Sequence, residues 1–306
     1  MRRELDEWGG LAELLKFSAA NKMRQATKAI GGIMRVWMGC FAVWILAAAV
    51  PAFAQTSPAS TELLSFSGNR VFSQNELLTV TEKCLAADPK WNEIHGPETL
   101  DYCLLKLKFF LFSKGYLQAA VGQPREETDG GRRIIVPIKE GALFRLGKVT
   151  IEGSRLLTPQ QLLDMLDLKS GDIAEGERFN VWLYERAKRA YERLGYLQYS
   201  AELEPAFQTK SASEGILDVR VIIEEGNQFT LRSIEFRGLG DMRPERLFRE
   251  MFVQKGDVFN KELFEESVKR IDRLAKFQAV DVEKDVDYRV VSDNQVDLTI
   301  HLKPLH

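Results

Sequence analysis

The sequence predicts an α+β protein of three tandem units, each with the element order β-α-α-β-β. One observation is a glycine that closes a short alternating apolar run at Gly68, Gly153 and Gly238, 85 residues apart each time. Another is the tetrapeptide GYLQ, which occurs at Gly115–Gln118 and at Gly195–Gln198. Each copy follows a helical apolar pattern and precedes a strand-like one. So long a period indicates tandem domains rather than a solenoid of small repeats.

The second unit shows the elements most clearly. Arg145–Ile151 alternates in hydrophobicity and is predicted as the first strand. Thr158 and Pro159 are typical of a helix N-cap and first helical residue, and this short helix is predicted to end near Leu168. The second helix and the last two strands are predicted over Phe179–Leu194, Tyr196–Leu203 and Ile216–Glu224.

The flanking units repeat this order. The apolar stripe of the long helix is predicted at Phe264, Val268, Ile271 and Ala275 in unit three, and at Leu100, Leu104, Leu107 and Leu111 in unit one. The last two strands are predicted over Phe277–Val286 and Val296–Leu302 in unit three, and over Tyr116–Val121 and Arg133–Lys139 in unit one. Pro137 disfavours a central strand, so unit one is expected to break its pairing there or to be irregular. The predicted domains are residues 62–141, 143–226 and 228–304.

The N-terminal segment, residues 1–54, has a different character. Arg35 precedes an apolar run, Val36–Val50, and the run is followed by the small-x-small sequence Ala52–Ala54. This pattern predicts a secretory signal cleaved between Ala54 and Gln55. The alternative is an uncleaved membrane anchor, although the run is shorter than the roughly 20 residues of a spanning helix.

Two cysteines, Cys84 and Cys103, follow the predicted signal, and both lie on apolar faces of the helices of unit one. Export to an oxidising compartment permits a disulfide between them. Two buried free thiols are the alternative. A metal site is not expected, because His95 is the one further ligand nearby.

Other chemistry finds little support in the sequence. The net charge of −2 argues against a nucleic-acid partner. The three histidines do not stand at a recognisable spacing from a nucleophile, and the sequence contains no phosphate-binding loop and no HExxH motif. We therefore expect no catalytic residue, no cofactor and no enzymatic activity.

Three such units behind a secretory signal resemble a known family. Each first strand ends in the glycine of SGN, EGS or RGL, units one and two end in EG, and the second helix runs into GY or KF. This set resembles the polypeptide-transport-associated (POTRA) domain, the periplasmic module of BamA-type outer-membrane protein assembly factors and of two-partner secretion transporters. The resemblance implies, for each unit, a three-stranded mixed sheet with two helices on one face.

The resemblance also implies a function. A scaffold of this family is periplasmic and associates with the outer membrane through its partners, which are unfolded outer-membrane proteins or accessory assembly subunits. The sequence has no long series of amphipathic strand segments of the kind that builds a barrel, so a separate outer-membrane β-barrel is expected as a further partner. The chain is either a stand-alone protein or a fragment.

The resemblance places the second strand of each unit at a sheet edge, where an extended chain can add by β-augmentation. The candidate edges are Tyr116–Gln123, Tyr196–Glu204 and Phe277–Val286. The third carries several charges and is expected to be protected. The stretch YLQYSA is uncharged and is predicted to be the partner-binding edge; its residues are Tyr196, Leu197, Gln198, Tyr199, Ser200 and Ala201. An alternative function is that of an inner-membrane-tethered structural or division-type POTRA protein.

Overall fold

The computed structural model describes residues 63–86, 98–128 and 133–305. The predicted signal, with its cleavage between Ala54 and Gln55, lies outside the described residues. By internal contacts the chain divides into two compact units. One unit holds repeats two and three together with Lys108–Ala119, and the other holds the remainder of repeat one. Among the described residues, no helix is both long and apolar enough to cross a membrane.

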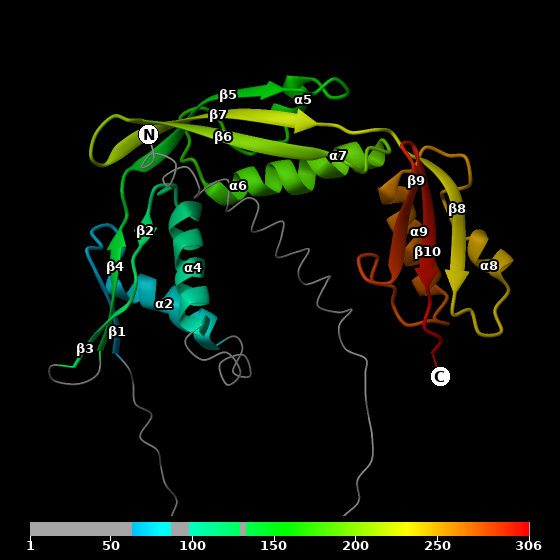
Figure 1. Ribbon diagram of the computed structural model, residues 1–306, viewed down its shortest axis with the longest axis horizontal. Helices are drawn as coiled ribbons and strands as arrows, with labels where there is room; N and C mark the ends of the chain where they lie inside the picture. Colours follow the sequence, from blue (N-terminus) through cyan, green and yellow to red (C-terminus); the bar gives the residue numbers. More distant parts are fainter. Residues whose placement is uncertain (1–62, 87–97, 129–132, 306) are drawn as a thin grey trace, which may run out of the picture. The chain divides into compact units, whose positions relative to one another are not determined.

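The predicted α+β class is confirmed, and Figure 1 shows the elements in chain order. Repeat one contains β1 (Leu63–Ser67), α2 (Gln74–Ala86), α4 (Glu98–Ser113), β2 (Ala120–Val121), β3 (Arg125–Glu127) and β4 (Arg133–Lys139). Repeat two contains β5 (Leu143–Glu152), α5 (Pro159–Leu163), α6 (Gly176–Asn180), the π-helical η2 (Val181–Ala187), α7 (Lys188–Arg193), β6 (Ser200–Thr209) and β7 (Glu214–Glu224). Repeat three contains β8 (Thr230–Arg237), α8 (Pro244–Phe248), α9 (Lys261–Arg273), β9 (Val286–Ser292) and β10 (Gln295–His301).

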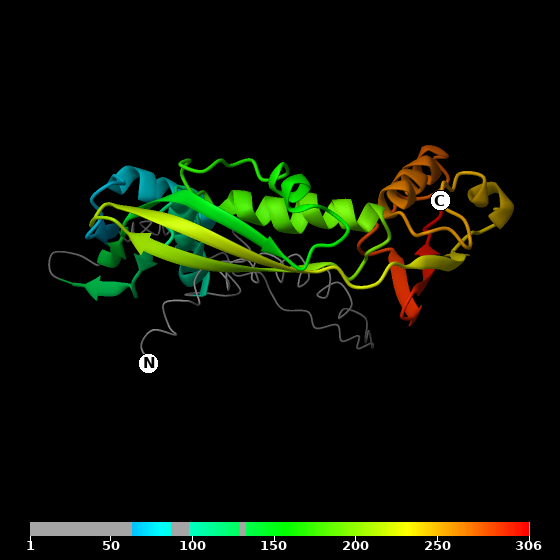
Figure 2. The same ribbon diagram turned by 90° about the horizontal axis from the view of Figure 1, so that it is seen from above.

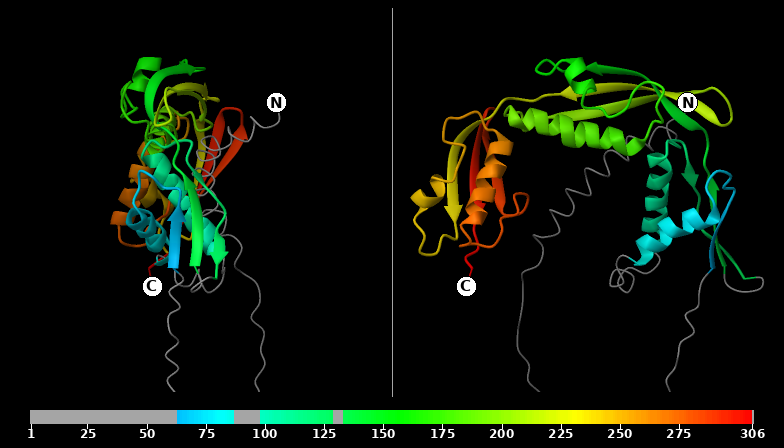
Figure 3. Two further views of the ribbon diagram at one scale, coloured as in Figure 1. Left: turned by 90° about the vertical axis from the view of Figure 1, so that its left-hand side faces the viewer. Right: turned by 180° about the vertical axis from the view of Figure 1, so that it is seen from behind.

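All three sheets are mixed and place the last strand of the repeat in the middle. The strand orders are β1-β4-β2, β5-β7-β6 and β8-β10-β9, and the first strand pairs in parallel with the last one in each case. Figure 2 shows the continuous helix α6-η2-α7 lying along the sheet of repeat two, and Figure 3 shows α9 beside the sheet of repeat three. Alternate residues of β7 and β10 are buried beneath these helices.

The first helix of each repeat begins at a similar position, and two of the three starts have the same cap. Thr158 and Gln161 form a capping box at α5, which confirms the predicted N-cap. In repeat one the Ser73 N–H donates to the Glu76 carboxylate (2.9 Å), and the Glu76 N–H donates to the Ser73 hydroxyl (3.3 Å). The two boxes are 85 residues apart in the sequence.

The irregularity predicted at Pro137 is present in repeat one. Pro137 lies within the central strand β4, and the neighbouring edge strand is split into β2 and β3. Residues 122–124 bulge out opposite Val136 and Pro137, and the Gly122 N–H donates to the Pro137 carbonyl (2.7 Å). A proline cannot donate to the ladder, so the break in pairing falls where the donor is missing.

Candidate partner-binding edges and the repeat boundary

The second strand of repeats two and three lies at a sheet edge, as expected. Among the strands that the structure describes, β6 pairs only with β7, and β9 pairs only with β10. The free side of such a strand presents backbone donors and acceptors to any extended chain that approaches. These two strands are therefore the candidate surfaces for partner binding.

The edge strand of repeat two begins later than the sequence predicts. Tyr196, Leu197, Gln198 and Tyr199 form a turn, so of the six predicted edge residues only Ser200 and Ala201 belong to β6. Leu197 packs against the core of repeat three, and the buried Tyr199 ring stacks on Tyr191 with centroids 4.6 Å apart. The burial of Leu197 and Tyr199 accounts for part of the lack of charges in this stretch.

The strand β6 itself carries protection. Pro205 lies in its middle, and Glu202 and Glu204 are exposed along it. The Arg220 guanidinium bridges Glu204 and Glu152 on the open face of the sheet, each at 2.6 Å. Its hydrogen bond lowers the pKa of the Glu152 carboxyl. Proline and charged side chains both discourage the addition of another strand.

The edge strand of repeat three also begins later than predicted. The segment 277–285 is a loop, and β9 starts only at Val286. The charges expected to protect this edge lie before the strand and are paired locally, Asp281 with Lys284 and Asp285 with Lys303, both at 2.6 Å. The sequence predicts that these charges protect the edge of repeat three. This prediction was wrong, because the charges do not lie on β9.

β9 differs from β6 in that it contains no proline, although Asp287 and Arg289 are exposed along it. Its sequence, VDYRVVS, contains no proline and no glycine, and every residue after Val286 is exposed. Val290 is 51% exposed, although it lies on the side of the sheet that faces the helices. An exposed apolar side chain on an unpaired edge is suited to contact with an extended apolar segment.

The turn after α7 forms the boundary between repeats two and three. The Phe229 N–H, just before β8, donates to the Gly195 carbonyl (2.8 Å). The Gln228 side-chain amide donates to the neighbouring Leu194 carbonyl (2.9 Å). Because Leu197 packs on the core of repeat three, this boundary combines backbone hydrogen bonds with an apolar contact.

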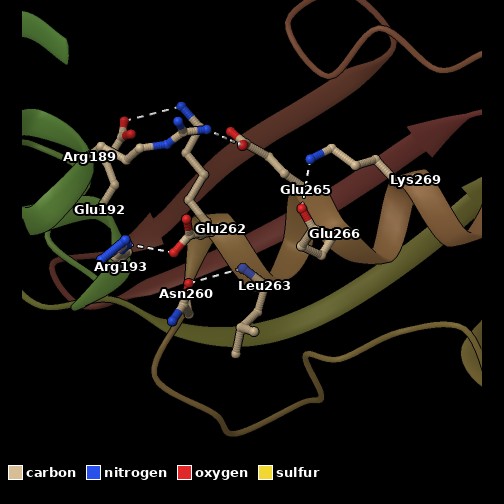
Figure 4. Close-up of polar contacts among 10 residues, drawn as sticks. Arg189, Glu192, Arg193, Asn260, Glu262, Leu263, Glu265, Glu266 and Lys269 are labelled. Carbon is tan, nitrogen blue, oxygen red and sulfur yellow. Dashed lines mark hydrogen bonds and ion pairs between the residues drawn. The ribbon is translucent and has the colours of Figure 1, made fainter. Parts of the chain in front are cut away.

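Ion pairs reinforce the same boundary between α7 and the start of α9, as Figure 4 shows. Arg193 pairs with Glu262 at 2.5 Å, and Arg189 pairs with Glu265 at 3.1 Å. The Glu192 carboxylate is mostly buried and binds both Lys188 of its own helix and Lys261 of α9. The two ammonium groups compensate this mostly buried charge, and the removal of both would leave the carboxylate unpaired, which is strongly destabilising.

The EG marker at the end of repeat two also has a structural role. The Glu225 carboxylate accepts hydrogen bonds from the Arg155 and Leu156 N–H groups, at 2.7 and 2.8 Å, and from the Tyr191 hydroxyl at 3.0 Å. Partial burial raises the pKa of Glu225, but these hydrogen bonds outweigh it and lower the pKa. Glu225 thereby holds the loop after β5 against α7.

Sequence reasoning missed the boundary contacts of Leu197 and the buried residues Trp182 and Tyr191. The signal that could have found Leu197 is GYLQ itself, which was interpreted only as a helix end and a strand start. The structure joins Cys84 and Cys103 by a disulfide, with 5.6 Å between their Cα atoms. No cluster of three metal-ligating side chains occurs within the described part of the chain.

Comparison with known proteins agrees with this architecture. The POTRA family, described as "Surface antigen variable number repeat", matches residues 144–226 and 229–304. The outer membrane protein assembly factor BamA of Nitratidesulfovibrio vulgaris is 25% identical over 199 residues, which cover 63% of this chain and 24% of the relative. BamA of Neisseria meningitidis serogroup B is 24% identical over 229 residues, which cover 71% of this chain and 28% of the relative.

This chain thus spans about a quarter of the length of the curated relatives that it matches. Among solved structures, POTRA domains 3–5 of Haemophilus influenzae BamA align with a TM-score of 0.61 at 20% identity, over 79% of this chain and 96% of that one. That similarity establishes the shared fold. With more than half of its residues matched by the family, the chain belongs to the POTRA family.

Proposed function

We propose that this chain is a periplasmic scaffold for the assembly or translocation of outer-membrane proteins. It binds extended segments of unfolded outer-membrane proteins, or accessory assembly subunits, by β-augmentation. It works beside a separate outer-membrane β-barrel and associates with the membrane through its partners. The assembly-factor relatives support this role, since they share the repeats.

The observation that carries the mechanism is the open edge of β9. Backbone pairing along an edge depends little on side-chain sequence, which suits a module that handles many different clients. The seven residues of β9 have an unpaired side, no proline and two exposed valines, Val290 and Val291. We place the main binding edge there, and a secondary one at Ser200 and Ala201 in β6, before Pro205.

A charge on the edge tests the mechanism. The probe is a fluorescently labelled outer-membrane β-barrel protein, diluted from urea into the full chain, with anisotropy as the readout. We expect Val290→Lys to weaken binding about tenfold, because a lysine on an edge opposes strand addition. The control is Leu263→Lys, which adds the same charge at an exposed apolar position of α9. Equal affinity of the two variants would contradict binding along β9.

A second experiment tests the location. The tagged full-length chain is purified from fractionated membranes, and its N-terminus is sequenced. A mature start at Gln55, together with a co-purifying outer-membrane barrel, supports the assembly scaffold. A chain that retains residues before Val36 in the inner-membrane fraction would instead support the tethered structural protein.

A further inference from the structure

The boundaries between repeats one and two and between repeats two and three contain the same backbone hydrogen bond. Gly115 and Gly195 each follow the last turn of the long helix, and both have a φ of +87°. Their carbonyl oxygens accept hydrogen bonds from the N–H groups of Phe144 (3.0 Å) and Phe229 (2.8 Å), which lie at the start of the next repeat. Phe144 and Phe229 are 85 residues apart, so the contact is repeated with the sequence.

Both glycines are also sites of close approach. A Cβ atom at Gly115 would lie 2.5 Å from Ile173 Cγ2, and one at Gly195 would lie 2.8 Å from Val258 Cγ1 and 3.1 Å from the Phe229 carbonyl oxygen. Ile173 and Val258 are again equivalent residues of repeats two and three. A side chain at either glycine would therefore push the next repeat away, besides straining the backbone.

A second glycine follows the last strand of repeats one and two. Gly141 and Gly226 have φ values of +76° and +71°, and they lie beside Gln118 and Gln198 of the two GYLQ segments. At Gly226 the approach is tight, since a Cβ atom would lie 2.7 Å from the Gln198 Cβ. Each internal boundary thus contains a pair of left-handed glycines.

Repeat three has neither glycine. The residue after the last turn of α9 is Ala275, which keeps a positive φ of +51°. Ile138, Ile223 and Leu302 occupy equivalent positions against Gly68, Gly153 and Gly238, so the counterpart of Gly141 and Gly226 is Leu305. After β10 the chain turns back onto its own repeat, because the Leu305 N–H donates to the Lys276 carbonyl (3.1 Å).

We propose that this glycine pair decides whether one POTRA repeat docks on the next, and that Ala275 and Leu305 close the end of repeat three to another repeat of this kind. The Ala275 methyl group occupies the position in which the residues of an incoming repeat that are equivalent to Phe229 and Val258 would have to lie. Any neighbour of this end of repeat three must therefore contact it through a different geometry.

One substitution at Gly195 tests the docked boundary between repeats two and three. In the full chain, Gly195→Ala is expected to speed hydrogen exchange of the Phe229 amide about tenfold while both repeats stay folded, because its acceptor is displaced. The control is Gly171→Ala, which has a φ of +94° but no atom within 4 Å of the added Cβ. The control adds backbone strain without the clash. Equal exchange at Phe229 in the two variants would overturn the proposal.

A second experiment tests whether Ala275 prevents a further repeat from docking on repeat three. A chain in which Leu302 is followed by a second copy of Glu224–Pro304 supplies Gly226 and a further repeat behind Ala275. Spin labels at Glu245→Cys in both copies report how firmly the copies are joined, through the width of their distance distribution. We expect a broad distribution with Ala275 and a narrow one after Ala275→Gly. A narrow distribution with Ala275, or a broad one in both chains, would overturn the proposal.

Discussion

Repeats one and two join their two helices by different chemistry, although they share one element order. In repeat one a disulfide links Cys84 of α2 to Cys103 of α4. In repeat two the Trp182 indole, only 1% exposed, donates to the Leu162 carbonyl at the end of α5 (2.7 Å). Repeat three uses neither, and the buried Ser267 hydroxyl of α9 accepts a hydrogen bond from the Phe252 N–H after α8 (2.8 Å). Each repeat thus has a link at this place, and its chemistry differs from one repeat to the next.

The largest expected effect is at the link of repeat two. Trp182→Ala should lower the free energy of unfolding of this repeat by about 3–5 kcal/mol, since it leaves a large cavity and an unpaired carbonyl. Chemical denaturation followed by far-UV circular dichroism measures it. Trp182→Phe, which keeps most of the volume but not the donor, should cost clearly less. Equal costs would show that the hydrogen bond, not the packing, dominates the link.

The second-largest effect on stability is expected for the disulfide of repeat one. Replacing Cys84 and Cys103 together with alanine should cost about 3 kcal/mol, because a loop of this size is no longer closed in the unfolded chain. The measurement is the denaturation midpoint of repeat one, with and without a reductant. The reductant should leave repeats two and three unchanged, and it should have no effect on the double variant. A reductant-insensitive wild type would mean that the two thiols are free in solution.

A smaller effect is expected in repeat three. Ser267→Ala leaves the Phe252 N–H without its partner and should cost about 1–2 kcal/mol. The matched control is Ser292→Ala at the exposed end of β9, where the hydroxyl contacts only Asn294. If the two variants unfold at the same denaturant concentration, Ser267 contributes no link between the helices.

The smallest effect concerns the open sheet face of repeat three. Hydrogen bonds from Arg232, and then from Ser233, lower the pKa of Asp297 from 3.8 to about 2. A lowered folded-state pKa means that this stabilisation is present above pH 4 and is lost as the pH falls toward 2. The stability of repeat three, followed by urea unfolding, should decline over this interval. Asp297→Asn should reduce this decline in stability. If stability falls equally steeply with pH in the variant and the wild type, Asp297 is not the group responsible.

Much of this fold could be predicted from local signals. The first strands end in glycine, Thr158 caps α5, and the apolar stripes of the long helices identify most of their buried residues, such as Leu107, Leu183 and Val268. The irregular strand pairing at Pro137 could also be predicted, because a proline has no backbone N–H to donate. These features depend on residues close together in the sequence.

The starts of the edge strands could not be predicted in this way. Tyr196 and Phe277 have side chains that favour strands, yet both precede β6 and β9 by several residues. Contacts with distant residues determine the outcome, because Leu197 belongs to the packing of repeat three and Phe277 is buried in the core of its own repeat. The strand predicted over Tyr196–Ala201 was misplaced for the same reason, since a buried turn and an exposed partner-binding strand can both lack charged residues.

The boundary contacts have a consequence for modular exchange of these repeats. The last part of α4 and its following turn, Lys108–Ala119, group with repeat two rather than with the rest of repeat one. The compact unit is therefore out of phase with the sequence repeat, because the last part of the long helix of repeat one groups with repeat two. A recombination event that cuts at the EG motif would separate a repeat from the surface on which it was selected to pack. Exchange between such proteins should be tolerated best when the crossover lies inside the long helix, upstream of GYLQ.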